Sequence, residues 1–183
     1  MSGRRPLHTW DRLAADIVYA CGIFSVRRDR SRFSRDQAEH DFHVLETPDW
    51  VNIVPLTSDE RVVLVRQYRH GVRDYTLEIP GGMLDADDPS PLVAARREMV
   101  EETGYDSDDV QPLGVIHPNP AIQANRCHTF VARDVALRRA PEFDSTEETE
   151  VVLVPLAEIP QLIRDGRITH ALVVVAFHWL ALR

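Results

Sequence analysis

The sequence contains no lysine, because all 21 basic residues are arginines; they face 29 acidic residues, and the net charge is −8. General nucleic-acid binders and proteins that bind anionic membranes are usually basic, so this charge argues against both classes. Any side-chain cation that holds a phosphate must here be an arginine, whose guanidinium can bind two oxygens at once.

Cysteine is also scarce, with only Cys21 and Cys127, both in strand-like surroundings. Free buried thiols in a reducing compartment explain them better than a disulfide does. The longest apolar run, residues 171–182, is too short to cross a bilayer as a helix, which takes about 20 residues. No N-terminal segment has the pattern of a secretion signal. We therefore predict a soluble, cytoplasmic protein without a membrane or nucleic-acid partner.

The 183 residues suffice for one ordinary domain with an appended small sheet, and 44% hydrophobic residues exclude disorder. Helices are predicted over residues 155–166 and 169–183, although valines 173–175 leave the second open to a strand. Together with a third helix, described below, and many strands, they indicate an α/β protein in which helices flank a mixed sheet. The strand-like runs are residues 16–20, 22–26, 42–46, 50–56, 61–69, 75–79, 113–117, 127–132 and 150–156.

The third predicted helix starts at Ser90 and Pro91, an N-cap followed by a first-turn proline, and stops at Gly104. It carries three glutamates on one face, since their spacings are i,i+3 and i,i+4. Like charges at i,i+4 cost a few tenths of a kcal/mol, and the C-terminal end of a helix favours cations. A hard divalent cation such as Mg²⁺ would offset this charge; a solvated acidic face is the alternative. The glutamates are Glu98, Glu101 and Glu102.

Residues 97–105, REMVEETGY, and the preceding Gly82 resemble the Nudix box, GX5EX7REUXEEXGU, where U is a bulky apolar residue. The second half matches throughout. The first half has one residue more than the box, and either Asp87 or Asp88 stands near the place of its central glutamate. The resemblance implies an α/β/α sandwich with a mixed sheet, binding of Mg²⁺ or Mn²⁺, and hydrolysis of a nucleoside diphosphate linked to another group.

Residues 62–85, VVLVRQYRHGVRDYTLEIPGGMLD, and residues 163–182 resemble the ADP-ribose and nucleoside-diphosphate-sugar pyrophosphatase branch of the same family. This branch implies a nucleotide substrate; from ADP-ribose the products would be AMP and ribose 5-phosphate. It also implies a homodimer. Residues 1–43 would form N-terminal strands for dimerisation, which need a partner surface because a small isolated hairpin is marginal, and residues 44–183 would form the hydrolase domain.

The resemblance also implies roles for individual residues. The metal ligands would be the Gly81 carbonyl, Glu98, Glu101, Glu102 and Glu147. The catalytic carboxylates would be Glu101, Glu102 and Glu148, the last because Ser145 stands where the family can have its base. Substrate contacts are expected from Arg69, Glu78 and Arg126.

Three alternatives stay open. The chain could be a Nudix enzyme for another nucleotide, such as a dinucleotide or a nucleoside triphosphate. It could be a Nudix-like module that senses a nucleotide without cleaving it, or an acidic structural protein. A zinc site at Cys127 and His128 is not expected, because adjacent strand residues point to opposite faces of a sheet.

Overall fold

The computed structural model describes residues 7–141 and 149–183. The chain divides into two compact units: Met1–Pro48 with His117–Asn125, and Asp49–Ile116 with Arg126–Arg183.

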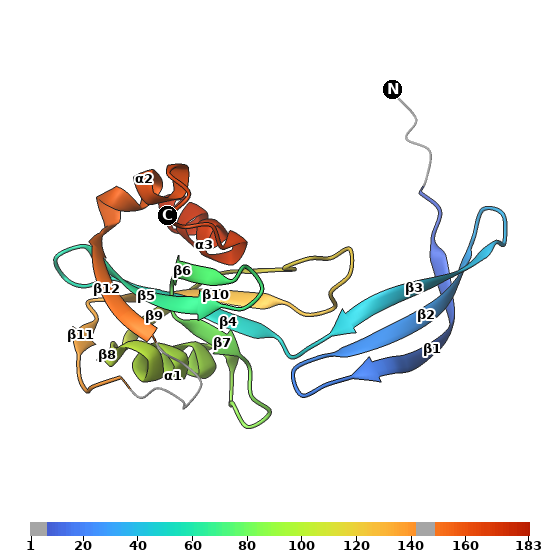
Figure 1. Ribbon diagram of the computed structural model, residues 1–183, viewed down its shortest axis with the longest axis horizontal. Helices are drawn as coiled ribbons and strands as arrows, with labels where there is room; N and C mark the ends of the chain where they lie inside the picture. The colour runs from blue at the N-terminus through green and yellow to red at the C-terminus, as the bar shows by residue number, and fades with distance from the viewer. Residues whose placement is uncertain (1–6, 142–148) are drawn as a thin grey trace. The chain divides into compact units, whose positions relative to one another are not determined.

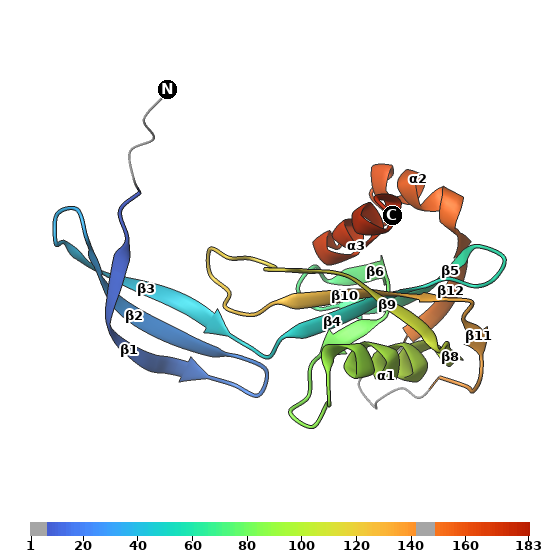
Figure 2. The same cartoon turned by 180° about the vertical axis from the view of Figure 1, so that it is seen from behind.

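The first unit is built on an antiparallel sheet in the order β1-β2-β3 (Figure 2), formed by Trp10–Ala20, Ser25–Phe33 and Glu39–Glu46. Trp10 stacks on Phe33 with 4.7 Å between ring centroids. The predicted strand at residues 22–26 is wrong at its start, because residues 22–24 form the turn before β2.

The second unit contains the remaining strands and the helices (Figure 1). One sheet has the order β7-β4-β10-β9 and another has the order β12-β5-β6, while the short β8 and β11 pair with each other. β4 and β10 are parallel and their other neighbours are antiparallel, which confirms the predicted mixed sheet. The strands are Trp50–Pro55 (β4), Arg61–Arg69 (β5), Asp74–Glu78 (β6), Gly81–Met83 (β7), Tyr105–Asp106 (β8), Asp109–Ile116 (β9), Cys127–Arg133 (β10), Ala136–Leu137 (β11) and Thr149–Pro155 (β12).

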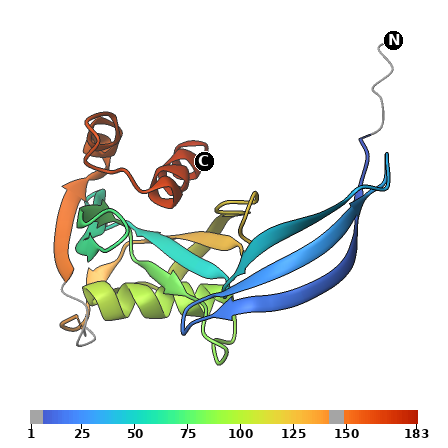
Figure 3. The ribbon, with the colours of Figure 1, turned by 45° about the vertical axis from the view of Figure 1, so that its right-hand side comes forward.

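The central strands of this unit bury both faces. In β5, Val62 and Leu64 enter an apolar core with α2 and α3, whereas Val63 enters a second core with α1. Figures 1 and 3 accordingly show α1 on one side of the strands and α2 and α3 on the other. The result is the predicted α/β/α sandwich, and the unbroken apolar run of β5 follows from burial on both faces.

The helices are α1 (Pro91–Thr103), α2 (Ile159–Arg164) and α3 (Ala171–Ala181). A 3-10 turn, Leu156–Glu158, runs directly into α2, so the predicted helix at residues 155–166 begins as a 3-10 turn and ends at Arg164. The strand alternative for residues 169–183 is wrong, because α3 occupies this segment. Along the described residues, every helix falls short of the length and apolarity needed to cross a membrane.

Candidate active site

The short strand β7 approaches its neighbours so closely that only glycine fits. A Cβ on Gly81 would lie 2.3 Å from the carbonyl oxygen of Val51 and 2.9 Å from the Cα of Asn52, both on β4. A Cβ on Gly82 would lie 2.6 Å from the Glu98 carboxylate on α1. The backbone of Gly81 and Gly82, called the glycine edge below, therefore contacts β4 on one side and the acidic helix α1 on the other.

Helix α1 has the ends predicted for it. The Ser90 hydroxyl accepts a hydrogen bond from the Val93 N–H at 3.3 Å, and Pro91 follows in the first turn. At the other end Gly104 adopts the left-handed conformation, with φ of 74°, and its N–H donates to the Val100 carbonyl. These caps fix the start and the stop of the helix, and hence the direction of its glutamates.

Two of the three predicted glutamates lie at the glycine edge. The Gly81 N–H donates to Glu102 Oε2 at 3.2 Å, and the Glu98 carboxylate lies under Gly82. Burial raises the pKa of Glu98 above its ordinary value, against the opposing effect of Arg97. Glu101 is more exposed, and its carboxylate shares Arg97 Nη1 with that of Glu98, at 2.9 and 3.0 Å. The structure thus brings Glu98 and Glu102 to Gly81 and Gly82, and joins Glu101 to Glu98 through Arg97.

Arg97 also contacts one of the two aspartates that stand near the place of the central glutamate of the box. Its guanidinium donates to both Asp88 oxygens, at 3.3 and 3.0 Å, and lies 3.3 Å from Asp85. The pKa of Asp88 is lowered, chiefly by these hydrogen bonds. The Asp85 N–H also donates to Asp88, at 2.9 Å. Asp88, rather than Asp87, joins the loop before α1 to the helix.

The donor chemistry of the glycine edge fits a hard divalent cation, which takes carboxylate and carbonyl oxygens. Glu98 and Glu102 supply such oxygens beside the backbone of Gly81. Over residues 7–141 and 149–183, however, no set of three His, Cys, Asp or Glu side chains is arranged to hold a metal ion. A cation at this edge would need further oxygens from a substrate or from another segment. Glu147 and Glu148, the predicted loop ligand and base, lie outside the described residues.

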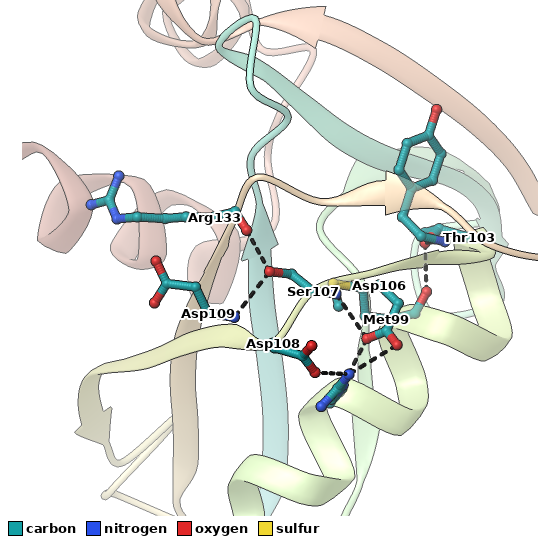
Figure 4. A network of polar contacts seen from close by, with 9 residues as sticks. Met99, Thr103, Asp106, Ser107, Asp108, Asp109 and Arg133 are labelled. Carbon is teal, nitrogen blue, oxygen red and sulfur yellow. Dashed lines mark hydrogen bonds and ion pairs between the residues drawn. The ribbon is translucent and has the colours of Figure 1, made fainter.

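The C-terminal end of α1 is anchored by a polar network (Figure 4). Arg96 donates to both Asp106 oxygens at 2.7 and 3.0 Å and to Asp108 at 2.7 Å. The Thr103 hydroxyl donates to the Met99 carbonyl and accepts from the Tyr105 N–H. This network holds the turn that carries Glu102, and the sequence reasoning did not identify it.

On β5 and β6, Arg69 and Glu78 form a two-pronged ion pair with both N–O distances at 2.9 Å. The Glu78 side chain is only 4% exposed and also accepts from the Thr76 hydroxyl at 2.6 Å. Burial alone would raise the pKa of Glu78, but the Arg69 and Thr76 hydrogen bonds outweigh it and the pKa is lowered. His170 Nε2 lies 4.0 Å from the same carboxylate.

A pocket of about 460 Å³ joins this ion pair to the glycine edge. Its volume lies in the range of sites for small ligands, about 300–1,000 Å³. Apolar side chains and a few polar groups line it, as is usual for such sites. The lining residues used below are Asn52, Arg69, Glu78, Gly81, Gly82 and His170.

Arg126, predicted to touch substrate, does not line this pocket. Its N–H donates to Asp49 Oδ1 at 2.8 Å and its side chain is exposed. Cys127 and His128 point to opposite faces, as predicted: Cys127 lines the pocket, whereas His128 lies 3.1 Å from Asp49. Burial raises the pKa of the Cys127 thiol to about 11, so it stays protonated.

The sequence reasoning missed Asn52, Thr76 and His170. Only His170 carried a local signal, because it precedes the apolar run of α3 and its Nδ1 caps that helix by accepting from the Leu172 N–H at 3.2 Å. Asn52 and Thr76 sit within strands, where sequence spacing gives no distance to residues of other elements.

The chain is similar to known proteins in both sequence and fold. The sequence profile of the NUDIX domain matches residues 46–175. The GDP-mannose pyrophosphatase of Salmonella typhimurium is 29% identical over 180 residues, which cover 92% of this chain and 93% of that protein. The ADP-ribose pyrophosphatase of Bacillus subtilis is 26% identical over 141 residues, 76% of each chain.

One further sequence relative and one solved structure are also similar to the chain. A protein named methanol dehydrogenase activator, from Bacillus methanolicus, is 29% identical over 141 residues, again 76% of each chain. A crystal structure described as an ADP compounds hydrolase has the same fold, with a TM-score of 0.84 and 25% identity. The match covers 97% of this chain and 95% of that one.

Proposed function

The chain belongs to the Nudix family of hydrolases, and we propose that it cleaves the diphosphate bond of ADP-ribose or of a nucleoside diphosphate sugar with the help of Mg²⁺. The observation that carries this proposal is the position of the glycine edge. Gly81 and Gly82 touch the carboxylates of α1 on one side and line the 460 Å³ pocket on the other. A substrate whose uncharged end enters the pocket can thus present its diphosphate to the glutamates. The relatives that act on ADP-ribose and GDP-mannose support this substrate class.

The charges at this edge explain the need for a cation. A diphosphate beside Glu98 and Glu102 would be repelled, since like charges at close range oppose each other. Bound Mg²⁺ would supply the compensating positive charge and make a water molecule more acidic, and hence a better nucleophile. Glu98, Glu102 and the Gly81 carbonyl are the proposed ligands, with Glu101 and Glu147 completing the set.

The remaining roles concern protons and orientation. We propose Glu148 as the group that accepts the proton of the attacking water. Arg69 and Glu78 orient the substrate from the pocket, because their ion pair fixes both side chains at its wall. Arg126 is the weakest of the proposed contacts, since it lies outside the pocket and its exposed side chain could reach only a substrate that extends beyond it.

The decisive experiment is an assay of the purified protein on a panel comprising ADP-ribose, ADP-glucose, GDP-mannose, a dinucleotide and a nucleoside triphosphate. We expect release of a nucleoside monophosphate from ADP-ribose or from a sugar nucleotide, with Mg²⁺ and not with EDTA. Cleavage of the triphosphate alone would overturn the substrate assignment. Binding of a nucleotide without any product would instead indicate a sensing module.

We also infer a homodimer and a cytoplasmic location. The first unit exposes large apolar side chains that a second copy could cover, namely Trp10, Leu13, Ile17, Val18, Tyr19 and Phe42. The location rests on the cysteines: Cys21 and Cys127 are both free, which suits a reducing compartment.

A further inference from the structure

One buried polar atom beside the pocket has no partner in the described protein. Asn52 lies on β4 and lines the pocket, and the whole residue is only 6% exposed. Its side-chain oxygen, Oδ1, nevertheless has no hydrogen-bond partner. Proteins pair the large majority of their buried polar atoms, because an unpaired acceptor loses its water without compensation. An orphaned amide oxygen at the wall of a ligand pocket therefore indicates a missing donor.

The local backbone keeps Asn52 next to the pocket. Asn52 pairs with Gly81 across β4 and β7, and a Cβ on Gly81 would come within 2.9 Å of the Asn52 Cα and Cβ. Any side chain at residue 81 would thus crowd Asn52, whereas glycine leaves it against the pocket. The last torsion of asparagine is broad, so a small rotation suffices to bring Oδ1 onto a donor of a ligand in the pocket.

The neighbouring charges define what this amide can bind. Glu78 is buried, carries its negative charge and lines the same pocket. The positive charge of Arg69 is matched by Glu78. The oxygen that lacks a partner is Asn52 Oδ1, which needs a donor, whereas an ionised phosphate offers only acceptors and could not pair with it.

His170 adds a donor to the same wall. Its Nδ1 accepts the Leu172 N–H at 3.2 Å, so the proton of the neutral ring lies on Nε2. His170 also lines the pocket. The pocket therefore combines an unsatisfied acceptor, a carboxylate and an N–H donor, a set that suits an uncharged group carrying its own N–H or O–H donors.

We propose that Asn52 is a specificity-determining residue, whose amide hydrogen-bonds an N–H or O–H donor on the uncharged end of the substrate. That end is the nucleobase or the sugar, and the diphosphate lies beside Gly81 and Gly82. This inference rests on the proposed function and extends it to the part of the substrate that the pocket takes.

The test is Asn52→Leu, which removes the amide and keeps its approximate volume. Without ligand, we expect an equal or higher Tm, because an unpaired buried acceptor has been replaced by an apolar group. With substrate and Mg²⁺, we expect KM to rise about tenfold, as for the loss of one substrate hydrogen bond, with kcat nearly unchanged. A lower Tm with unchanged KM would show that Asn52 is only structural, and would overturn the proposal.

Thr129→Val is the matched control. Thr129 lies beside Asn52 in the parallel register of β4 and β10, is 2% exposed and is not part of the pocket lining. This change removes a buried polar group from the same layer. We expect it to leave KM unchanged; an increase equal to that of Asn52→Leu would mean that any loss of polarity in this layer acts on the pocket, and would also overturn the proposal.

Substrate pairs identify the group that Asn52 contacts. If it contacts a base amine, Asn52→Leu abolishes the wild-type preference for ADP-ribose over its inosine analogue. If it contacts a sugar hydroxyl, the variant loses the preference for a sugar nucleotide over its deoxy analogue. Either result supports the proposal, and retention of both preferences with wild-type KM overturns it.

Ligand-induced Tm shifts in EDTA separate this inference from the proposed function. A wild type that binds the panel but cleaves none of it defeats only the proposed hydrolysis, and a smaller Tm shift in Asn52→Leu then still supports the contact. A wild type that cleaves the panel with an indistinguishable Asn52→Leu defeats only the contact. A wild type that neither binds nor cleaves the panel defeats both.

Discussion

Arg97 offsets the repulsion between the carboxylates at the acidic end of α1. It contacts four carboxylates, those of Asp85, Asp88, Glu98 and Glu101, and these contacts raise its own pKa, the Asp88 hydrogen bonds most of all. Aspartate is one methylene shorter than the glutamate of the box, and the extra residue in this loop accompanies the shorter side chain. In this chain Arg97 and Asp88 link the loop to the helix.

The first prediction concerns Glu102. Glu102→Gln retains an oxygen that can accept the Gly81 N–H bond but loses the negative charge proposed to hold the cation. We expect kcat to fall by two orders of magnitude or more, as for loss of a metal-dependent step, with Tm changed little. Steady-state turnover with Mg²⁺ and thermal unfolding without it are the measurements. Wild-type turnover in the folded variant would remove Glu102 from the proposed mechanism.

The second prediction concerns pH and Glu78. The folded-state pKa of Glu78 lies below its ordinary value of 4.5. Its charge therefore stabilises the fold above about pH 4.5, and this contribution is lost as the pH falls through 4.5 and then through the lower folded value. Glu78→Gln keeps the shape and removes the charge. We expect its free energy of unfolding at pH 7 to be lower by about 1–3 kcal/mol, as for a hydrogen bond to a charged group.

The difference between Glu78→Gln and the wild type should then shrink as the pH is lowered, which denaturant unfolding from pH 7 to pH 3 would measure. A gap that stays constant over this range would mean that the charge of Glu78 contributes nothing to stability. Asp74→Asn, on the exposed end of the same strand, is the control for a lost charge without a buried partner.

Single residues could be predicted only where their role is local. Glu98 and Glu102 were placed on one face by helix spacing alone, and the structure has them beside Gly81 and Gly82. The choice between Asp87 and Asp88 needed the position of Arg97. Asn52 and His170 come from strand and helix segments that meet only in the fold, and no spacing in the sequence brings them together.

At the scale of elements, β7 and α1 lie close together because Gly82 has no side chain that would meet Glu98 on α1. Gly82→Ala would place a methyl group 2.6 Å from the Glu98 carboxylate, closer than real Cβ atoms come. We expect Glu98 to be pushed from the glycine edge, with a large loss of Mg²⁺ affinity and turnover. The loss of stability should be small, because the atoms that must move are the far end of a flexible side chain. Titration with Mg²⁺ and steady-state kinetics would measure this.

Gly114→Ala is the matched control for Gly82→Ala. It would place a Cβ 2.7 Å from the Trp179 ring, where β9 packs on α3. The added methyl group would meet a rigid ring away from α1, so Tm should fall while Mg²⁺ affinity is kept. Equal loss of Mg²⁺ affinity in both variants would show that general destabilisation, not displacement of Glu98, weakens binding.

An element could be predicted when its own residues carry a recognisable pattern, such as a helix cap or an apolar run. The ends of α1 were predicted because caps are local, and β4 and β5 because strands buried on both faces read as apolar runs. Most of β2, SVRRDRSRF, was missed because its strand is held by charge pairs. Arg27 pairs with Asp29 and Glu46, and Arg32 with Glu39. Such a strand has no hydrophobic alternation to detect.

At the level of the whole chain, the NUDIX profile starts at residue 46, close to the limit of the first unit at Pro48. The 29% identical GDP-mannose pyrophosphatase nevertheless matches over 180 residues, and the structural match covers 97% of this chain. The segment before residue 46 is therefore also found in these relatives. The glycine edge and the pocket, in contrast, are formed by residues of the second unit.

This first unit yields the last prediction. Among the strands of the described residues, its β1 pairs only with β2, and it carries Ile17, which is 55% exposed. Large apolar side chains gathered on a small sheet favour burial against another surface, and two-fold pairing would let each copy cover the other. If it does, Ile17→Glu buries an unpaired charge at the interface and should convert a dimer into a monomer at micromolar concentration. Sedimentation velocity measures the change.

Val115→Glu is the control, because Val115 lies on β9 of the second unit and is 52% exposed. It introduces the same charge elsewhere and should leave the dimer intact. A wild type that sediments as a fully active monomer would refute the homodimer, and would leave residues 1–43 without the role proposed for them.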